Sequence, residues 1–141
     1  TEHFTLEELT VSEIATRFNL DNKPNAETII NLTRLANFLE KIRALLNRPI
    51  HINSGYRSLE VNSKLGSKAT SQHTIGCAAD ITVGDLTPDL LVKAIVHSDL
   101  QYDQVIREYD SWVHISIPSK EGVAPRKQAL IIDKSGTRPY A

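Results

Sequence analysis

One amphipathic segment in the first third of the chain limits the folds that are open to it. From Asn25 onward, apolar residues recur at three- and four-residue spacing until Asn47-Arg48-Pro49 ends the pattern. The apolar positions are Ile29, Leu32, Leu35, Ala36, Leu39, Ile42 and Leu46. This spacing predicts one long helix with Asn25 as its N-cap, and such a helix must bury its apolar stripe against a second layer.

Shorter elements around that helix supply the second layer. Further helices are expected at the Thr5–Glu8 capping box, at Ser12–Phe18, at Ser58–Leu65 and after Thr87-Pro88. Strands are expected at Ile50–Asn53, Cys77–Val83, Gln104–Arg107, Trp112–Ile117 and Gln128–Ile132. The sequence therefore predicts an α+β fold, with N-terminal helices packed on a small, mainly antiparallel sheet. We expect one domain over residues 1–141.

Composition and charge exclude several classes of protein. Hydrophobic residues make up 40% of the chain and charged residues 23%, as in an ordinary globular protein. The longest apolar run, Ala129–Ile132, is far shorter than the roughly 20 residues of a membrane span. The net charge of −1 disfavours a nucleic-acid partner, and the single cysteine excludes an intrachain disulfide. We expect a monomer without a membrane span, and no secretion signal is visible at the N-terminus.

A carboxylate inside a predicted apolar strand is the first indication of a functional site. Asp80 lies within Cys77–Val83, where an unpaired charge would be costly unless it bound a partner or a metal ion. His73 precedes it by seven residues, which would place the two on opposite faces of one continuous strand. Gly76 breaks the strand between them. The loop histidine and the strand aspartate can therefore converge on one point.

A second histidine lies on the polar face of a later strand. In Trp112–Ile117 the apolar residues alternate with Trp112, His114 and Ser116, so His114 can project into a cleft. Two histidines, one carboxylate and an open position form a catalytic zinc set. The same three ligands also form the facial triad of non-haem iron oxygenases. Those enzymes usually separate the first histidine and the acid by one residue, whereas six residues intervene here, which argues against an oxygenase.

The motifs together resemble a known family. They are Ser54-Gly55-Tyr56-Arg57-Ser58, Asn62, the pattern Ser71-x-His73-x-x-Gly76-x-Ala78-x-Asp80, and Trp112-Val113-His114. This set is similar to the zinc D-alanyl-D-alanine carboxypeptidases, a family that includes phage L-alanyl-D-glutamate endopeptidases acting as endolysins. The family shares its fold with the hedgehog signalling domain. The helical segment that precedes the motifs also resembles phage-borne members, so the similarity covers most of the chain.

The resemblance implies roles for individual residues. His73, Asp80 and His114 would bind Zn²⁺. Arg57 matches the family arginine that helps to hold the substrate peptide, although a surface arginine is the plain alternative. Ser71 would bond the substrate backbone or cap its own loop.

Trp112 is a further candidate beside these residues. It would line the cleft for substrate or simply pack, and the sequence favours neither interpretation.

The general base is less clearly indicated. Water attack at a zinc centre needs a carboxylate that accepts the water proton and passes it to the leaving amine. The position three residues before His114 is Ser111, which cannot do this. Glu108 and Asp110 are the candidates. We favour Glu108, because it directly follows a predicted strand, whereas Asp110 suits a turn.

The expected function is therefore a zinc metallopeptidase that cleaves peptidoglycan stem peptides. The resemblance implies a D-Ala-D-Ala carboxypeptidase or an L-Ala-D-Glu endopeptidase, and a phage endolysin made in the host cytoplasm that degrades the bacterial cell wall. A non-catalytic, zinc-stabilised cell-wall binding domain is the main alternative, because no acid stands at Ser111. A non-haem iron oxygenase is the weaker alternative.

Overall fold

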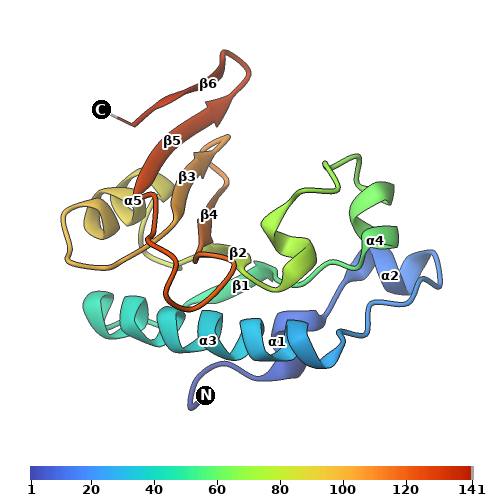
Figure 1. The fold of residues 1–141 in the computed structure, drawn as a ribbon. Helices are drawn as coiled ribbons and strands as arrows, with labels where there is room; N and C mark the ends of the chain where they lie inside the picture. Colours follow the sequence, from blue (N-terminus) through green and yellow to red (C-terminus); the bar gives the residue numbers. More distant parts are fainter. Residues whose placement is uncertain (141) are drawn as a thin grey trace.

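The computed structural model of the chain describes residues 1–140 and has the predicted α+β architecture, in which short helices and one long helix surround a single sheet (Figure 1). The helices are α1 (Leu6–Thr10), α2 (Glu13–Arg17), α3 (Ala26–Leu46), α4 (Leu59–Lys64), the 3-10 helix η1 (Gln72–Ile75) and α5 (Pro88–Val96). The strands are β1 (His51–Ser54), β2 (Ala78–Thr82), β3 (Gln104–Glu108), β4 (Trp112–Ser116), β5 (Gln128–Asp133) and β6 (Gly136–Pro139).

Local capping explains where the helices begin. The side chains of Thr5, Ser12, Asn25, Ser58 and Thr87 each accept a hydrogen bond from the backbone of the first helical turn. Helix α3 ends at Asn47, which has a left-handed φ of 52° and closes the helix as a C-cap. The predicted apolar stripe of α3 is buried except for Ile29, which is 37% exposed. Among the described residues, no helix is both long and apolar enough to cross a membrane.

One face of the sheet is covered by helices α3 and α5, and the opposite face carries polar side chains. Its strand order is β1-β2-β4-β3-β5-β6, and the pairings are antiparallel except for that of β3 with β5. Paired residues Ile81 and Val113 point to the face that packs on the helical layer, where the fully buried side chains of α3 and α5 lie. Because side chains alternate along a strand, their neighbours Asp80 and His114 point to the opposite face.

Two features of the C-terminal part differ from the sequence expectation. Strand β5 forms at the predicted place, but it runs parallel to β3, with Ile106 opposite Leu130. The sequence does not predict strand β6, because Gly136-Thr137-Arg138-Pro139 lacks alternating apolar residues. In the structure all four residues are exposed. Strand β6 is an edge strand that pairs only with β5 among residues 1–140, and an exposed proline is tolerated at such an edge.

A buried carboxylate clamps the long connection between β4 and β5. Asp103 accepts hydrogen bonds from the backbone N–H of Arg126 at 3.0 Å, from the Arg126 guanidinium at 2.6 Å and from Gln72 Nε2 at 2.9 Å. The hydrogen bonds from Arg126 hold the pKa of Asp103 below its usual range. The clamp therefore joins this connection to the residue that precedes His73.

Asp103→Ala is expected to lower the free energy of unfolding by about 2 kcal/mol, because the variant loses a buried carboxylate that accepts from both Arg126 and Gln72. A lowered native pKa means that the stabilisation is present above the unfolded pKa of about 3.9 and is lost as the pH falls through the native pKa. Urea denaturation of wild type and variant at pH 7 and at strongly acid pH measures this difference. Asp99→Ala removes an exposed aspartate nearby and is the control. A pH-independent difference would contradict the clamp.

Candidate metal centre

Three polar side chains are buried together on the face of the sheet that lies opposite α3 and α5. His73, Asp80 and His114 are 3%, 5% and 8% exposed. Their ligand atoms lie within 4.8 Å of one another, and within residues 1–140 they form the group of histidine and acid side chains that could hold a metal ion. Asp80 and His114 are direct cross-strand partners in β2 and β4. The structure therefore brings together the three residues that the sequence motifs singled out.

The loop that carries His73 depends on a glycine. Gly76 ends η1 with a left-handed φ of 79°, and a Cβ at this position would lie 2.9 Å from the backbone oxygen of Thr28. A side chain would therefore be strained here and would push η1 away from α3. This close approach lets the chain enter β2 directly after η1, so that His73 faces Asp80 across the break.

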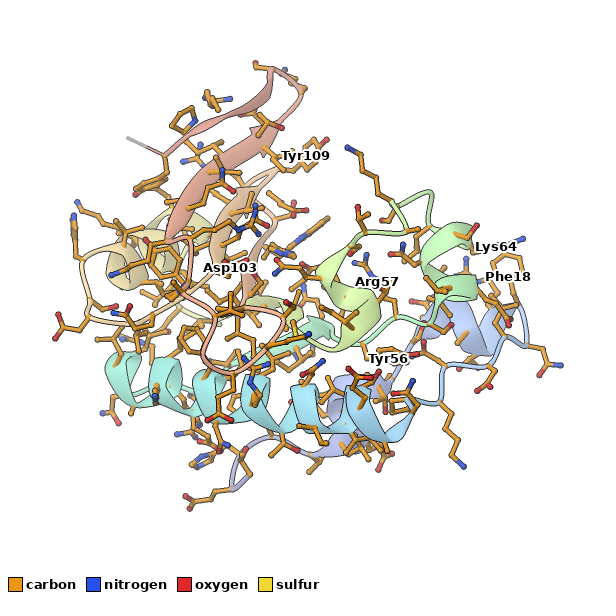
Figure 2. The ribbon with its side chains drawn as sticks, viewed as in Figure 1. Phe18, Tyr56, Arg57, Lys64, Asp103 and Tyr109 are labelled. Carbon is orange, nitrogen blue, oxygen red and sulfur yellow. The ribbon has the colours of Figure 1, made fainter. Side chains whose placement is uncertain are left out.

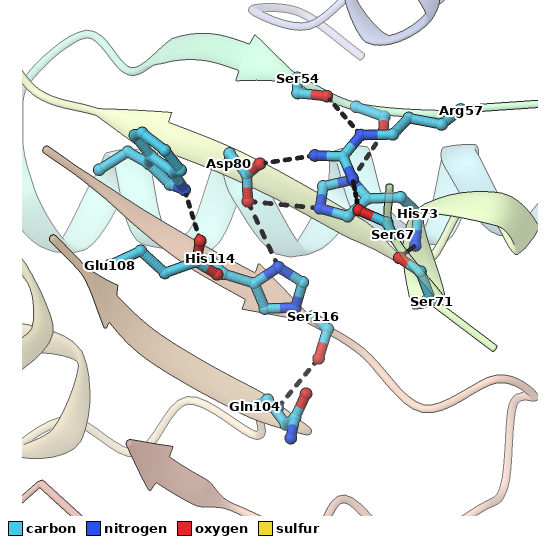
Figure 3. A network of polar contacts seen from close by, with 12 residues as sticks. Ser54, Arg57, Ser67, Ser71, His73, Asp80, Gln104, Glu108, His114 and Ser116 are labelled. Carbon is cyan, nitrogen blue, oxygen red and sulfur yellow. Dashed lines mark hydrogen bonds and ion pairs between the residues drawn. The ribbon is translucent and has the colours of Figure 1, made fainter. Parts of the chain in front are cut away.

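The orientation of both imidazoles suits metal binding. His73 Nδ1 lies 2.8 Å from the carbonyl oxygen of Gly55, which can only accept, so Nδ1 carries the proton and Nε2 offers its lone pair. His73 Nε2 and His114 Nδ1 each lie 3.3 Å from Asp80 Oδ1 (Figure 3). A tetrahedral zinc ion with bonds of 2.0–2.2 Å holds its ligand atoms about 3.3–3.6 Å apart. The two nitrogen–oxygen separations match this geometry and all three ligand atoms lie within 4.8 Å of one another, so the residues could hold zinc and leave a fourth position for water or substrate.

Electrostatics in the site favour an ionised Asp80. Burial alone would raise its pKa, but the close approach of His114 and His73 holds the pKa well below its usual range. Arg57 lies on the other oxygen, with its terminal nitrogen 3.1 Å from Asp80 Oδ2. A buried carboxylate with these partners is a ready anionic ligand.

Arg57 is itself held in place. Its Nε donates to the hydroxyl of Ser54 at 3.1 Å, while the other terminal nitrogen lies 3.5 Å from the Ser67 hydroxyl (Figure 3). These serines were not singled out as site residues from the sequence, although Ser54 belongs to the motif around Arg57. The contact between Arg57 and Asp80 shows that the guanidinium supports one of the three candidate ligands.

Glu108 lies on the same face as the three ligands. It pairs with Trp112, whereas its strand neighbour Ile106 pairs with His114, so Glu108 and His114 are diagonal neighbours. Its Oε2 accepts a hydrogen bond of 3.1 Å from the indole N–H of Trp112. Burial raises the pKa of Glu108 and the nearby charge of Asp80 adds to the rise, while His114, Trp112 and Arg57 act in the opposite direction.

The other sequence candidates have different surroundings. Asp110 lies in the β3–β4 turn with a left-handed φ of 51°, and its exposed carboxylate forms an ion pair with Arg107 at 3.1 Å. Arg107 pairs with Val113 and so belongs to the face opposite His114. Ser71 is the N-cap of η1, and its hydroxyl accepts from the backbone N–H of His73 at 3.3 Å. The structure thus places Glu108 on the sheet face of the three candidate ligands, whereas the Asp110 side chain is paired with Arg107.

Comparison with known proteins agrees with this geometry. A family model described as Peptidase M15 matches residues 2–116. The matched range begins before α1 and ends at the last residue of β4, so it contains the three candidate ligands, Arg57 and Glu108. It leaves out the connection after β4 and the β5–β6 hairpin. A search of curated protein sequences finds no match.

Proposed function

The chain belongs to the peptidase M15 family, and on that premise we propose that it is a zinc-dependent peptidase that cleaves the stem peptides of bacterial peptidoglycan, acting on the cell wall as a phage endolysin. The observation that carries the proposal is the buried group of His73, Asp80 and His114 on the same sheet face as Glu108. A binding domain has no need of a partly buried carboxylate beside the metal ligands. Glu108 therefore favours a catalyst over a non-catalytic zinc domain.

His73 Nε2, Asp80 Oδ1 and His114 Nδ1 would hold the zinc ion. When bound, zinc would polarise the scissile carbonyl and lower the pKa of a water molecule. Glu108 accepts the proton of the attacking water on its carboxylate and returns it to the nitrogen of the leaving amine. Its raised pKa suits both steps, since a carboxyl with a higher pKa is a better base when ionised and still a competent acid when protonated.

Arg57 has two tasks in this proposal. It engages Asp80 Oδ2, which leaves Oδ1, the oxygen that faces both histidines, free to bind the zinc ion that this site would hold. Its contact with Ser67 is long at 3.5 Å, so that nitrogen can exchange the serine for a carbonyl or carboxylate oxygen of the substrate. Trp112 would form the wall beside Glu108, and the main part of Ser71 would be to hold the loop of His73.

Mass spectrometry of purified peptidoglycan digested with the zinc-loaded protein tests the function and identifies the bond. Release of terminal D-alanine identifies a carboxypeptidase. Stems that begin with a new glutamate amine identify an L-Ala-D-Glu endopeptidase. A chelator should abolish either product, and added zinc should restore it. If no zinc-dependent product forms, the peptidase proposal is wrong and a binding role replaces it.

The fall in activity at acid pH is expected to follow the protonation of Glu108. Because the base must be ionised, activity is lost as the pH falls through a pKa that is higher than that of an ordinary glutamate. Trp112→Phe removes the indole N–H that favours the ionised form, so it should move the acid limb of kcat/KM to still higher pH. Tyr109→Phe, an exposed aromatic in the adjacent turn, is the control and should leave the limb unchanged. An unmoved limb in Trp112→Phe would exclude this assignment.

A further inference from the structure

We propose that Asn22 is a positioning residue of the metal centre, although it lies in the loop between α2 and α3. Its Nδ2 donates to the carbonyl oxygens of Thr10 at 2.8 Å and Tyr56 at 3.1 Å. Its Oδ1 accepts from the backbone N–H of Ser58 at 2.7 Å. One amide side chain therefore fixes the backbone on both sides of Arg57. This inference rests on the proposed zinc function of His73, Asp80 and His114.

The backbone that Asn22 fixes supports two of the three ligands. The carbonyl of Gly55 accepts from His73 Nδ1 and so selects the tautomer in which Nε2 can bind a metal. Arg57 holds Asp80 Oδ2, and its backbone N–H donates to the His73 carbonyl at 3.1 Å. A shift of this short segment would therefore move the supports of His73 and Asp80 together.

The segment has little regular structure to hold it. Residues 55–58 lie between β1 and α4 and belong to neither a strand nor a helix. Beyond Asn22, it is tied to α1 through the hydrogen bond from the Tyr56 N–H to the Leu9 carbonyl at 2.8 Å. A Cβ at Gly55 would lie 2.3 Å from that carbonyl oxygen, so the approach admits only glycine. Figure 2 shows Tyr56 and Arg57 between the N-terminal helices and the hairpin that carries Tyr109.

The partners of Asn22 distinguish its role from ordinary loop capping. An asparagine that caps a turn bonds backbone groups two or three residues away, as Asp21 does to the N–H of Lys23. The bonds of Asn22 instead reach across 12, 34 and 36 positions of the chain. The N-terminal helical segment therefore contributes to the metal centre by supporting the loop of Arg57.

Asn22→Ala is expected to weaken zinc binding by the full-length protein roughly tenfold, which is the lower end of the effect of losing a supporting hydrogen bond near a metal ligand. Competition with a chromophoric zinc chelator measures the affinity. Asn25→Ala is the matched control: it removes the cap that accepts from the Thr28 N–H at 2.8 Å and destabilises α3 without touching residues 55–58. It should leave the zinc affinity within twofold of wild type. Nitrogen NMR of the zinc-free protein should show His73 protonated at Nδ1 in wild type and Asn25→Ala, and a mixture of tautomers in Asn22→Ala.

The outcomes separate this inference from the function on which it rests. If wild type binds no zinc, the proposed function and the inference both fail. If wild type binds zinc and Asn22→Ala binds it equally well, only the inference is overturned. Equal losses in both variants would also overturn it, because they would reflect general destabilisation. Should Asn22→Ala not fold, Asn22→Asp keeps the acceptor for Ser58, places a second oxygen against the Tyr56 carbonyl, and carries the same expectation.

Discussion

Asp80→Ala is expected to eliminate stoichiometric zinc binding and, with it, zinc-dependent cleavage of peptidoglycan. Asp80 is the central member of the site, because its Oδ1 lies 3.3 Å from a nitrogen of each histidine. Two histidines alone make a weak zinc site, since protein zinc centres use at least three ligands. Zinc content of the purified protein by inductively coupled plasma mass spectrometry and digestion of peptidoglycan together measure the loss.

The same substitution leaves the guanidinium of Arg57 without its carboxylate. Arg57 is partly buried, so some loss of stability accompanies the loss of the metal. Circular dichroism shows whether the variant still folds. Asp85→Ala removes an exposed aspartate from its ion pair with Arg48 and should keep both zinc and activity. A folded Asp80→Ala protein that retains one zinc ion would show that the metal lies elsewhere.

Local sequence signals predicted the helices well because capping and periodicity act over a few residues. Asn25 accepts from the Thr28 N–H, and the apolar spacing that follows defines both the length of α3 and the side of it that is buried. The same holds for strand β2, whose apolar run made Asp80 conspicuous. For such elements, the information needed is contained in one contiguous segment of chain.

Local sequence signals could not predict which strands pair with one another when the strands lie far apart in the sequence. The apolar run Ala129–Ile132 predicts a strand, but nothing in it distinguishes a parallel partner from an antiparallel one. Strand β6 is held by its ladder to β5 and by the ion pair of Arg138 with Asp133 at 2.9 Å, and its own composition does not favour a strand. Long-range hydrogen bonds decide these elements, and local propensity does not.

In the candidate site, too, some residues are indicated by local sequence motifs, whereas the roles of others depend on long-range contacts. The residue types in the motifs pointed to a possible metal set, and the family resemblance of those motifs named His73, Asp80 and His114 as its ligands. The partner of Arg57 was not predictable, since a guanidinium can serve a substrate or a neighbouring carboxylate equally well. The contribution of Asn22 was hidden for a further reason: asparagine is common in loops, and its partners lie far away in the sequence.

The sequence favours Glu108 over Asp110 because Glu108 directly follows a predicted strand, whereas Asp110 suits a turn. The structure has a turn between β3 and β4 in which Tyr109 and Asp110 have φ angles of 52° and 51°. Parity counted along the sequence therefore says nothing about Asp110. The β3–β4 register places Glu108 on the same face of the sheet as His114.

Glu108→Gln is accordingly expected to lower kcat by about 10²–10⁴-fold, the usual contribution of a positioned general base. The amide has nearly the shape of the carboxylate, and its oxygen can still accept from the indole N–H of Trp112. Glu108 is outside the group of three ligands, so the zinc content should remain that of wild type. Turnover of purified peptidoglycan, measured together with zinc stoichiometry, separates the loss of a base from the loss of the metal.

Asp110→Asn is the matched control for this experiment, because it makes the same chemical change two residues further along the chain. It weakens only the exposed ion pair with Arg107, so its kcat should stay within about twofold of wild type. The reverse result, an inactive Asp110→Asn with an active Glu108→Gln, would move the general base into the turn. That outcome would require the turn to rearrange on substrate binding, because in the structure the Asp110 carboxylate is paired with Arg107, whose backbone position faces away from His114.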